Sequence, residues 1–391
     1  MSQNIYFKIS EDVDPTIWNR NLKKSKTSNF FQCYEFIKLR SSNKNRIPVF
    51  IQIFEQSEVI GQLALIIRQS AKAYSSDFME TIVKQFSNLG RRGVWVGGPI
   101  IHSDKLEQQF LILEQILSAL ETISKNYKLS IIDGYSPIME SILEKKYLTK
   151  FSEFGYTHEK FFTFLINLEN DLDKLWKNIQ KNMRGDVTRA NRRGMVIKEL
   201  NEFSQVDDFL QMAQQWGKTK GISKSVNDEN YKKELWNCIQ GRKLKIFLAY
   251  ENNFLMASHS LGIFNKNILY FEIRNSYSKS ANLAGPSLAW YTIEWSKKQG
   301  FLEYDFSGGK SLPIGCSPSE LYSYNKQWSS LINYKKKWGG KEMPYYHFIK
   351  VRNKKFYKLF RLITIPDNLI RNFKKTRYKK DFKISLKKNG S

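Results

Sequence analysis

Basic residues crowd one segment near the middle of the chain, and their spacing suits the binding of phosphate groups. Between Lys174 and Lys198 there are eight basic side chains and a single acid, Asp186. Such a run has almost no opposite charges four residues apart, so its cations repel one another unless an anion is present. The pattern indicates contact with a polyanion, although an ordinary solvated helix face would also carry an excess of charge.

The residue types that covalent or metal-assisted catalysis needs are not grouped in the sequence. The three cysteines are far apart and form no Cys-x-x-Cys pair, and the four histidines lie in no metal-ligand spacing. We therefore expect no metal site, no disulfide framework and a reducing compartment. His259 lies inside an expected strand, where a core histidine is commoner than a general base.

The composition bounds the size and class of the protein. With 391 residues and 41% hydrophobic side chains, the chain can form two or three domains with real cores. Its formal net charge of +26 favours a polyanionic partner: nucleic acid, an anionic membrane or a phosphorylated substrate. No apolar run is as long as a membrane span, and no signal segment opens the chain. We expect a cytoplasmic protein, with peripheral contact at the inner face of the cell membrane left open.

The pattern of apolar residues places the basic segment between two similar α/β units. One helix is expected over Leu172 to Arg193, with its apolar residues on one face. After it, residues 269–309 indicate a strand, a helix beginning at Pro286, and a strand that contains Asp305. The first half has the same order of elements in residues 94–133, and each half also contains an expected antiparallel strand pair. The sequence therefore predicts two α/β domains in tandem.

The end of the chain has a different character. Residues 341–391 show no α/β pattern, and residues 350–365 interleave basic with apolar side chains. Such a segment predicts a basic amphipathic helix that can lie in an anionic lipid interface. A helix packed on the body, followed by a disordered basic end, is the alternative.

Three segments in order resemble the FemABX aminoacyltransferases, a branch of the GNAT-like acyltransferases. Residues 175–199 read LWKNIQKNMRGDVTRANRRGMVIKE and resemble the basic helix of that family. Residues 287–309 read SLAWYTIEWSKKQGFLEYDFSGG and resemble its segment ending in Tyr-Asp-Phe-Gly-Gly, with one additional residue, Ser307. Residues 333–346 read NYKKKWGGKEMPYY and are similar to its closing Phe-Lys…Gly-Gly motif.

The resemblance implies an α/β (α+β) fold class with two tandem GNAT-like acyltransferase domains. The expected domains are residues 1–155 and 160–347, the second containing the basic helix 172–193, followed by a basic amphipathic helical tail at 348–391. Residues 200–243 are too short for the coiled-coil arm that some relatives carry.

The resemblance also implies an activity. An aminoacyl group would pass from aminoacyl-tRNA to an amine of a lipid-linked or nucleotide-linked peptidoglycan precursor, with no separate cofactor and with a role in cell-wall synthesis and cell shape. Aminoacyl-tRNA is already an activated ester, so the enzyme must align the reactants, remove a proton and stabilise an oxyanion.

The resemblance assigns roles to individual residues. Lys335 matches the lysine of the closing motif and is expected at the acceptor phosphate or the reacting carbonyl; a surface lysine is the alternative. Asp305 is a base or an orienting group, or only the residue that forms the turn at its strand end. The expected phosphate-binding residues are Lys181, Arg184, Arg192 and Lys336.

Two other functions remain open. An acyl-CoA-dependent N-acyltransferase acting on an amino sugar or another surface-glycan amine would have the same fold. The loop 275–285 contains only one glycine, which disfavours a pyrophosphate-binding loop for coenzyme A. A non-enzymatic protein that binds RNA or membranes, with residues 350–391 as the membrane contact, is the third candidate.

Overall fold

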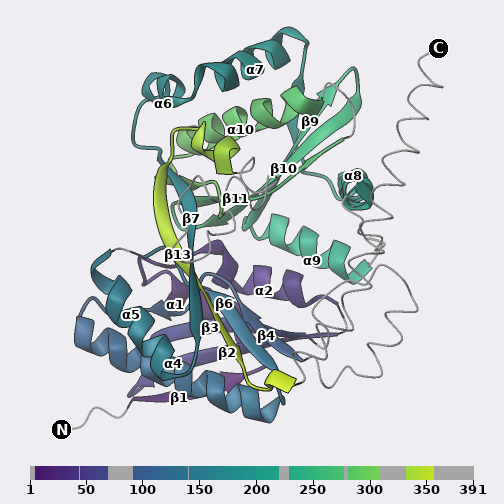
Figure 1. Ribbon diagram of the computed structural model, residues 1–391. Coiled ribbons are helices and arrows are strands. Elements are labelled where there is room, and N and C mark those ends of the chain that lie inside the picture. The colour runs from purple at the N-terminus through teal and green to yellow at the C-terminus, as the bar shows by residue number, and fades with distance from the viewer. Residues whose placement is uncertain are drawn as a thin grey trace.

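The computed structural model describes residues 5–43, 45–68, 91–139, 141–219, 229–276, 281–308 and 332–355, which form two lobes (Figure 1). The first lobe contains β1 (Ile5–Ser10), α1 (Pro15–Leu22), η1 (Phe30–Gln32), α2 (Tyr34–Ser41), β2 (Arg46–Glu55), β3 (Glu58–Arg68), β4 (Arg92–Trp95), β5 (Ile100–Ile101), α4 (Leu106–Asn126), β6 (Ile131–Tyr135) and α5 (Ser141–Glu153). The rest contains β7 (Thr157–Asn167), α6 (Leu172–Asn178), α7 (Lys181–Arg192), β8 (Val196–Glu199), α8 (Gln205–Thr219), α9 (Glu229–Gln240), β9 (Leu244–Glu251), β10 (Phe254–Phe264), β11 (Asn267–Asn275), α10 (Ala281–Lys298), β12 (Glu303–Asp305) and β13 (Lys341–Val351).

The described strands form one continuous sheet that runs through both lobes. Its order is β1-β2-β3-β4-β6-β13-β7-β12-β11-β10-β9-β8, and β5 pairs with β3. The pairs β4–β6 and β11–β12 are parallel, and each is connected by a helix, α4 or α10. The predicted repeat of strand, helix and strand is therefore confirmed, as are the antiparallel pairs β2–β3 and β9–β10.

The two lobes exchange their last strands at the centre of this sheet. β7 follows the first lobe in the chain, yet it pairs with β12 of the second. β13 follows the second lobe, yet it pairs with β6 of the first as well as with β7. Figure 1 shows both strands running between the lobes. Neither sheet half is complete without a strand from the other part of the chain.

β13 corrects the prediction that no α/β pattern follows residue 340. Lys350, expected to begin a basic helix, lies in this central strand and donates to Glu121 Oε1 at 2.5 Å and to the carbonyl of Phe154 at 2.7 Å. Both partners belong to the first lobe. Because they are far from Lys350 in the chain, the local sequence around Lys350 does not predict these contacts. Residues 356–391, the rest of the predicted tail, lie outside the described residues.

The predicted helix over residues 172–193 is also corrected, because the structure divides it into α6 and α7. Ile179 is extended at the break, and the backbone N–H of Gln180 donates to the carbonyl of Lys337 at 2.9 Å. The break is thus imposed by a distant segment rather than by a helix-breaking residue. The apolar face was predicted correctly: Leu175, Ile179, Met183, Val187 and Ala190 are buried.

The start of α10 differs from the prediction. The helix begins at Ala281, so Pro286 lies inside it rather than in its first turn. Gly300 follows its end, with φ at +77°, a left-handed conformation that glycine adopts without a steric penalty. Its buried side includes Leu288, Thr292 and Ser296, which are spaced four residues apart.

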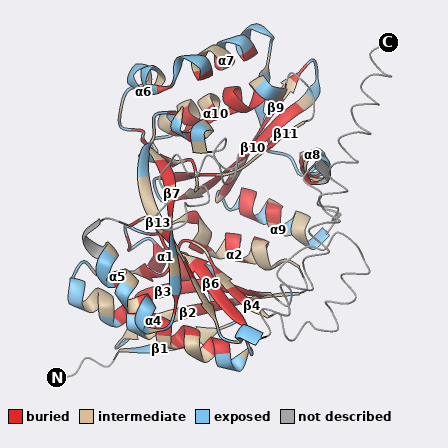
Figure 2. Ribbon diagram, viewed as in Figure 1, coloured by how far each residue is buried: buried red, intermediate tan, exposed pale blue. Residues whose placement is uncertain are grey.

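Helices cover both faces of the sheet. In the first lobe, α4 and α5 cover one face and α1 and α2 the other, while α10 and α7 lie over the second lobe. Figure 2 shows buried strands between helices that expose their outer sides. On the inner side, residues of α1, α2, α8 and α9 share one hydrophobic core, so the lobes pack together.

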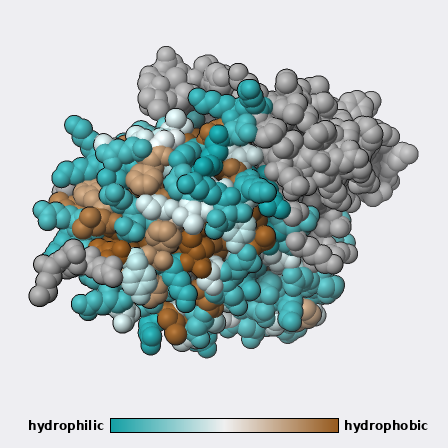
Figure 3. Space-filling view, turned by 90° about the horizontal axis from the view of Figure 1, so that it is seen from below, coloured by the Kyte–Doolittle hydropathy of each residue, from teal (hydrophilic) through white to brown (hydrophobic). Residues whose placement is uncertain are grey.

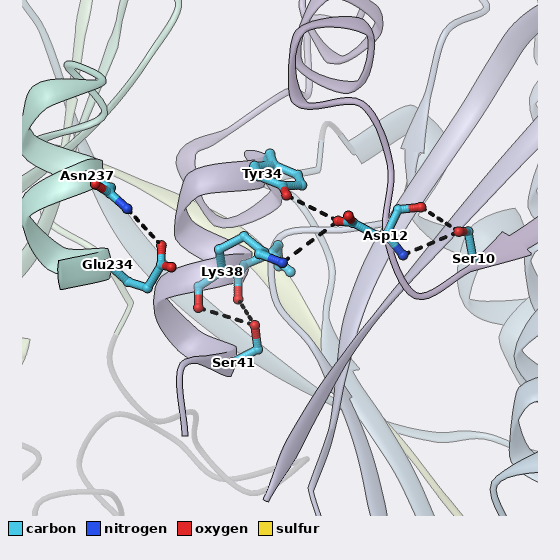
Figure 4. Close-up of polar contacts among 8 residues, drawn as sticks. Ser10, Asp12, Tyr34, Lys38, Ser41, Glu234 and Asn237 are labelled. Atoms are coloured by element: carbon cyan, nitrogen blue, oxygen red, sulfur yellow. Dashed lines mark hydrogen bonds and ion pairs between the residues drawn. The ribbon is translucent and has the colours of Figure 1, made fainter. Parts of the chain in front are cut away.

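In this shared layer α2 lies beside α9, and each helix has polar contacts of its own (Figure 4). The Tyr34 hydroxyl donates to Asp12 Oδ1 at 3.1 Å, and Lys38 Nζ lies 3.8 Å from the same oxygen. On α9, Asn237 donates to Glu234 at 3.4 Å. At the end of α2, the Ser41 hydroxyl donates to the carbonyl of Ile37 at 2.8 Å, which satisfies a carbonyl near the helix terminus.

Among the described residues, no helix is both long and apolar enough to cross a membrane. Seen from below, the molecule shows hydrophobic side chains interrupted by hydrophilic ones (Figure 3). α4 has two of the exposed large hydrophobic side chains, Leu106 and Leu111. Scattered exposed apolar residues of this kind are normal for protein surfaces.

The exchanged strand gives a test of the fold. Phe348 of β13 is fully buried, and its ring stacks on Phe151 of α5 at 3.7 Å between centroids. We expect Phe348→Ala to lower the free energy of unfolding by about 3–5 kcal/mol in urea titrations, because it leaves a cavity in the core of the first lobe. Lys341→Ala, at the exposed start of the same strand, is the control and should change little. Equal, small changes in both variants would contradict this role of β13.

Candidate active site

A cavity of about 760 Å³ lies between the two lobes, a size typical of small-molecule sites. The first lobe contributes the segment 24–31, the turn around Gly97 and Pro99, and the residues that follow β6. The second lobe contributes the ends of β10 and β12 and the start of β11. The exchanged strands β7 and β13, and residues of β5, α4 and α5, supply the rest of the wall. The residues used below from this lining are Lys24, Lys26, Tyr135, Thr163, Leu165, Glu303, Asp305, Ser307, Gly308 and Tyr345.

Asp305, one of the two predicted catalytic residues, lines this cavity. It is the last residue of β12, and the strand register places it opposite Leu165 of β7. Its Oδ1 accepts hydrogen bonds from the Thr163 hydroxyl and, at 2.8 Å, from the backbone N–H of Ser307. Burial raises the pKa of Asp305 to about 6, although both hydrogen bonds favour the ionised form. A carboxylate with this pKa is suited to accept a proton near neutral pH.

Lys335, the other predicted catalytic residue, lies behind the cavity wall. Only 4% of its surface is exposed, and Nζ donates to the carbonyls of Ser307 at 2.6 Å and Gly308 at 3.0 Å. Burial lowers its pKa to about 8, while the nearby Asp305 opposes that shift. Lys335 therefore holds the turn after β12, in which Ser307 adopts a left-handed φ of +60°.

Aromatic side chains from β6 and β13 form another part of the wall. Tyr135 and Tyr345 both line the cavity, with ring centroids 6.0 Å apart. The Tyr345 hydroxyl packs so closely on Gly308 that a β-carbon there would overlap it. Position 308 therefore excludes a side chain, which keeps the turn after Asp305 beside Tyr345. Rings with hydroxyl groups combine an apolar surface with hydrogen-bonding capacity.

A second carboxylate, Asp133 of β6, occupies the corresponding place in the first lobe. It accepts a hydrogen bond from Arg92 Nε at 2.5 Å and lies 3.0 Å from His347 Nε2. Burial raises its pKa, but the hydrogen bonds from His347 and Arg92 outweigh burial and keep the pKa below its ordinary value. Asp133 is therefore engaged in an ion pair with Arg92 and a contact with His347. Asp305, by contrast, has no cation bonded to it among the described residues.

The predicted phosphate-binding residues do not meet at this cavity. Lys181 and Arg192 are exposed on α7, which packs on α10, and Arg184 Nη1 donates to the carbonyl of Lys177 at 3.4 Å. Lys336 forms an ion pair with Glu342 at 3.2 Å. None of these four residues lines the cavity. The structure brings together Asp305 and Lys335, and it places the cations of α7 on a separate outer surface.

Several cavity residues were missed by sequence reasoning. Thr163 lies in an apolar strand and carries no signal of its own, and Tyr135 and Tyr345 are far apart in the chain. Lys24 and Lys26 belong to a short basic cluster that could have been noticed; their partners are Glu58 at 2.9 Å and Asp104 at 3.5 Å.

His259 is a core residue, as its strand position favoured. It is fully buried, its Nδ1 lies 3.2 Å from the Thr292 hydroxyl, and burial lowers its pKa to about 3. It does not line the cavity. A neutral ring packed against Tyr270, with centroids 4.0 Å apart, stabilises the second-lobe core.

Comparisons with known proteins support the fold. No protein-family model and no curated protein sequence matches the chain. FemX is similar in structure, with a TM-score of 0.65 at 13% sequence identity over 90% of this chain and 99% of FemX. L-PGS from Bacillus licheniformis is similar with a TM-score of 0.53 at 16% identity, over 93% of this chain and 98% of that protein.

A tandem GNAT protein from the clavulanic acid biosynthesis pathway is also similar, with a TM-score of 0.51 at 8% identity over 89% of this chain and 98% of that protein. At such identities the likeness shows the fold. The predicted tandem, GNAT-like α/β fold, of the kind that FemX has, is therefore confirmed.

The environment of Asp305 predicts a pH-dependent stability. Its folded-state pKa of about 6 lies above the ordinary 3.8, so the protonated form stabilises the fold at low pH and this contribution is lost as the pH rises through 6. Relative to Asp305→Asn, the wild-type free energy of unfolding should fall between about pH 4 and pH 7 in urea titrations. Glu303→Gln removes an exposed carboxylate on the same strand and is the control; it should keep the fall in stability but at a lower pH, because the charge of Glu303 helps to raise the pKa of Asp305. If the difference in free energy of unfolding between the wild type and Asp305→Asn did not change with pH, the raised pKa of Asp305 would be contradicted.

Proposed function

We propose that this protein is an aminoacyltransferase that moves an aminoacyl group from aminoacyl-tRNA to an amine of a peptidoglycan precursor. The observation that carries the proposal is Asp305, a carboxyl group with a pKa of about 6 on the wall of the interlobe cavity. The likeness in fold to FemX and L-PGS supports this class of reaction. The sequence motifs that resemble the FemABX family support it independently.

The chemistry needs one base and a fixed geometry. The ionised Asp305 removes a proton from the acceptor ammonium, and the neutral amine attacks the ester carbonyl carbon. The attached nitrogen then loses its extra proton to solvent. The bond between that carbon and the ribose oxygen breaks, and the ribose oxygen leaves as a hydroxyl by taking back the proton held by Asp305. Thr163 and the Ser307 N–H hold the carboxylate, while Lys335 holds the turn that carries Ser307. Positioning of this kind contributes a large part of the rate in acyl transfer.

The size of the cavity limits what enters it. A volume of about 760 Å³ accommodates the aminoacyl end of the donor and the amine-bearing end of the acceptor, but not a folded RNA. The remainder of a tRNA would lie on an outer surface. The exposed cations of α7, including Lys181 and Arg192, offer such a surface, since phosphate contacts dominate non-specific RNA binding.

The alternative is an acyl-CoA-dependent N-acyltransferase, for which the likeness to a tandem GNAT protein is the supporting observation. Its acceptor would be an amino sugar or another surface-glycan amine. Of the loop 275–285, residues 277–280 lie outside the described residues, so its geometry offers no argument for either donor. Asp305 would serve as the base in both reactions.

A donor comparison tests the proposal. Purified full-length protein would receive a lipid-precursor extract together with either radiolabelled aminoacyl-tRNA or radiolabelled acetyl-CoA. We expect label in the precursor only from aminoacyl-tRNA, and loss of that transfer after RNase treatment. Transfer only from acetyl-CoA would favour the alternative, and transfer from neither would contradict both.

The role of Asp305 gives a second prediction for the same assay. Asp305→Asn should lower kcat by about 10²–10⁴-fold and remove the limb of the pH profile near 6. Glu303→Gln, which also lines the cavity but is exposed, should retain the rate and keep the limb at a lower pH, because the charge of Glu303 helps to raise the pKa of Asp305. Loss of activity in Glu303→Gln but not in Asp305→Asn would place the base elsewhere.

The exposed cations on the surface of α7 give a third prediction for the transfer assay. Lys181→Gln combined with Arg192→Gln should raise KM for the tRNA donor without changing kcat, and should reduce its dependence on salt concentration. Lys8→Gln combined with Lys125→Gln removes two exposed charges from the first lobe and is the matched control. An unchanged KM in the α7 variant would exclude this surface as a donor contact.

A further inference from the structure

Three arginines face one another across neighbouring strands of the first lobe. Arg46 of β2 pairs in register with Arg68 of β3, and Arg68 pairs in register with Arg92 of β4. Residues in register point to the same face of a sheet, with β-carbons about 4.5–5.5 Å apart, and like charges in this arrangement are destabilising. The row lies on the α2 side, the face of Phe50 and Ile66.

A fourth arginine reaches this row from α2. Arg46 Nη1 donates to the backbone carbonyl of Arg40 at 2.6 Å, and the Arg40 guanidinium lies 5.6 Å from the centre of the Phe36 ring. Arg40, Arg46 and Arg68 are all half-buried. Burial, together with repulsion from neighbouring arginines, lowers the pKa of Arg40 and of Arg68 to about 10.

Within the described part of the chain, the carboxylate bonded to this row is Asp133, at the Arg92 end, and its charge also acts on Arg68. Asp133 binds Arg92 through both carboxylate oxygens and also contacts His347. No described carboxylate forms an ion pair with Arg40, Arg46 or Arg68, and the buried Nε of Arg68 has no hydrogen-bond partner there. Buried charges of one sign are costly unless a partner neutralises them.

α9 lies beside these side chains. Asn230 donates to the carbonyl of Ser42, just after α2, at 2.5 Å. Tyr231 of the same helix lies near Arg40 and Arg46, and burial raises the pKa of its phenol. Arg40, Arg46 and Arg68 thus project from α2 and from two strands of the sheet, on the side where α9 also packs.

We propose that Arg40, Arg46 and Arg68 bind the phosphate of a phosphate monoester or diphosphate. Guanidinium groups present planar pairs of N–H donors that match phosphate oxygens, and several of them suit a dianion better than a single carboxylate does. None of the three residues lines the interlobe cavity, so the site is distinct from the proposed catalytic centre. The same chemistry is offered by free phosphate and by a phosphomonoester lipid headgroup.

The test uses the full-length protein, with inorganic phosphate and pyrophosphate as probes and sodium chloride at matched ionic strength as the reference. We expect both anions to raise the melting temperature of the wild type and to give saturable heats in calorimetry. Arg68→Gln should weaken pyrophosphate binding about tenfold or more, equivalent to about 1.4 kcal/mol. Without the probe, this variant should melt no lower than the wild type, because a like-charge contact is removed.

Two further variants separate a binding site from a general effect of charge. Arg68→Lys keeps the charge and should restore part of the affinity. Arg91→Gln removes the neighbouring charge, whose guanidinium instead donates to the carbonyl of Tyr127 at 3.3 Å, and should bind pyrophosphate as the wild type does. Equal binding by wild type and Arg68→Gln, or equal losses in Arg68→Gln and Arg91→Gln, would overturn the proposal.

Vesicles identify the source of the phosphate. Co-sedimentation with phosphatidate-containing vesicles that is lost in Arg68→Gln but kept in Arg91→Gln would assign the site to a lipid headgroup. Binding of soluble pyrophosphate without Arg68-dependent sedimentation would assign it to a soluble phosphate ligand. No binding of either kind would reject the site, and because no transfer reaction is assayed, that result would leave the proposed function untouched.

Discussion

The exchange of β7 and β13 between the lobes is the constraint on which the rest of the structure depends. These strands pair with each other and connect β6 to β12, so one sheet crosses both lobes. Side chains alternate between the faces of a sheet, and the strand registers therefore set which residues meet. Tyr135, Tyr345, Thr163 and Asp305 come from four adjacent strands and lie on one face. A slip of one residue in either exchanged strand would turn its side chains away from the cavity.

The duplicated fold gives the two lobes different electrostatics at corresponding places. Asp133 is held by Arg92 and His347 and stays ionised, whereas Asp305 receives neutral donors and has a pKa of about 6. Two carboxylates whose environments move their pKa values apart can serve different roles. The first lobe uses its carboxylate as the counter-charge of Arg92, and the second presents its carboxylate to the cavity.

Local patterns in the sequence were enough to predict the repeated α/β units of the fold. Contacts between residues far apart in the chain could not be predicted from them. The periodicity of residues 94–133 and 269–306 predicted both parallel units, because each buries a helix on its own strands. The place of β13 and the break between α6 and α7 could not be predicted, since Glu121 satisfies Lys350 and Lys337 binds Gln180 across long stretches of chain. For the same reason Asp305 could be named from its motif, whereas its partner Thr163 could not.

The central claim is that acyl transfer takes place in the cavity beside Asp305, and filling that cavity tests it most directly. Leu165 of β7 lines the cavity and is the strand partner of Asp305, so Leu165→Trp adds bulk there without removing a polar group. The measurement is the rate of label transfer from aminoacyl-tRNA, with the urea midpoint of unfolding as the check on folding. The account predicts loss of transfer with the midpoint preserved. A folded variant that transfers label at the wild-type rate would contradict it.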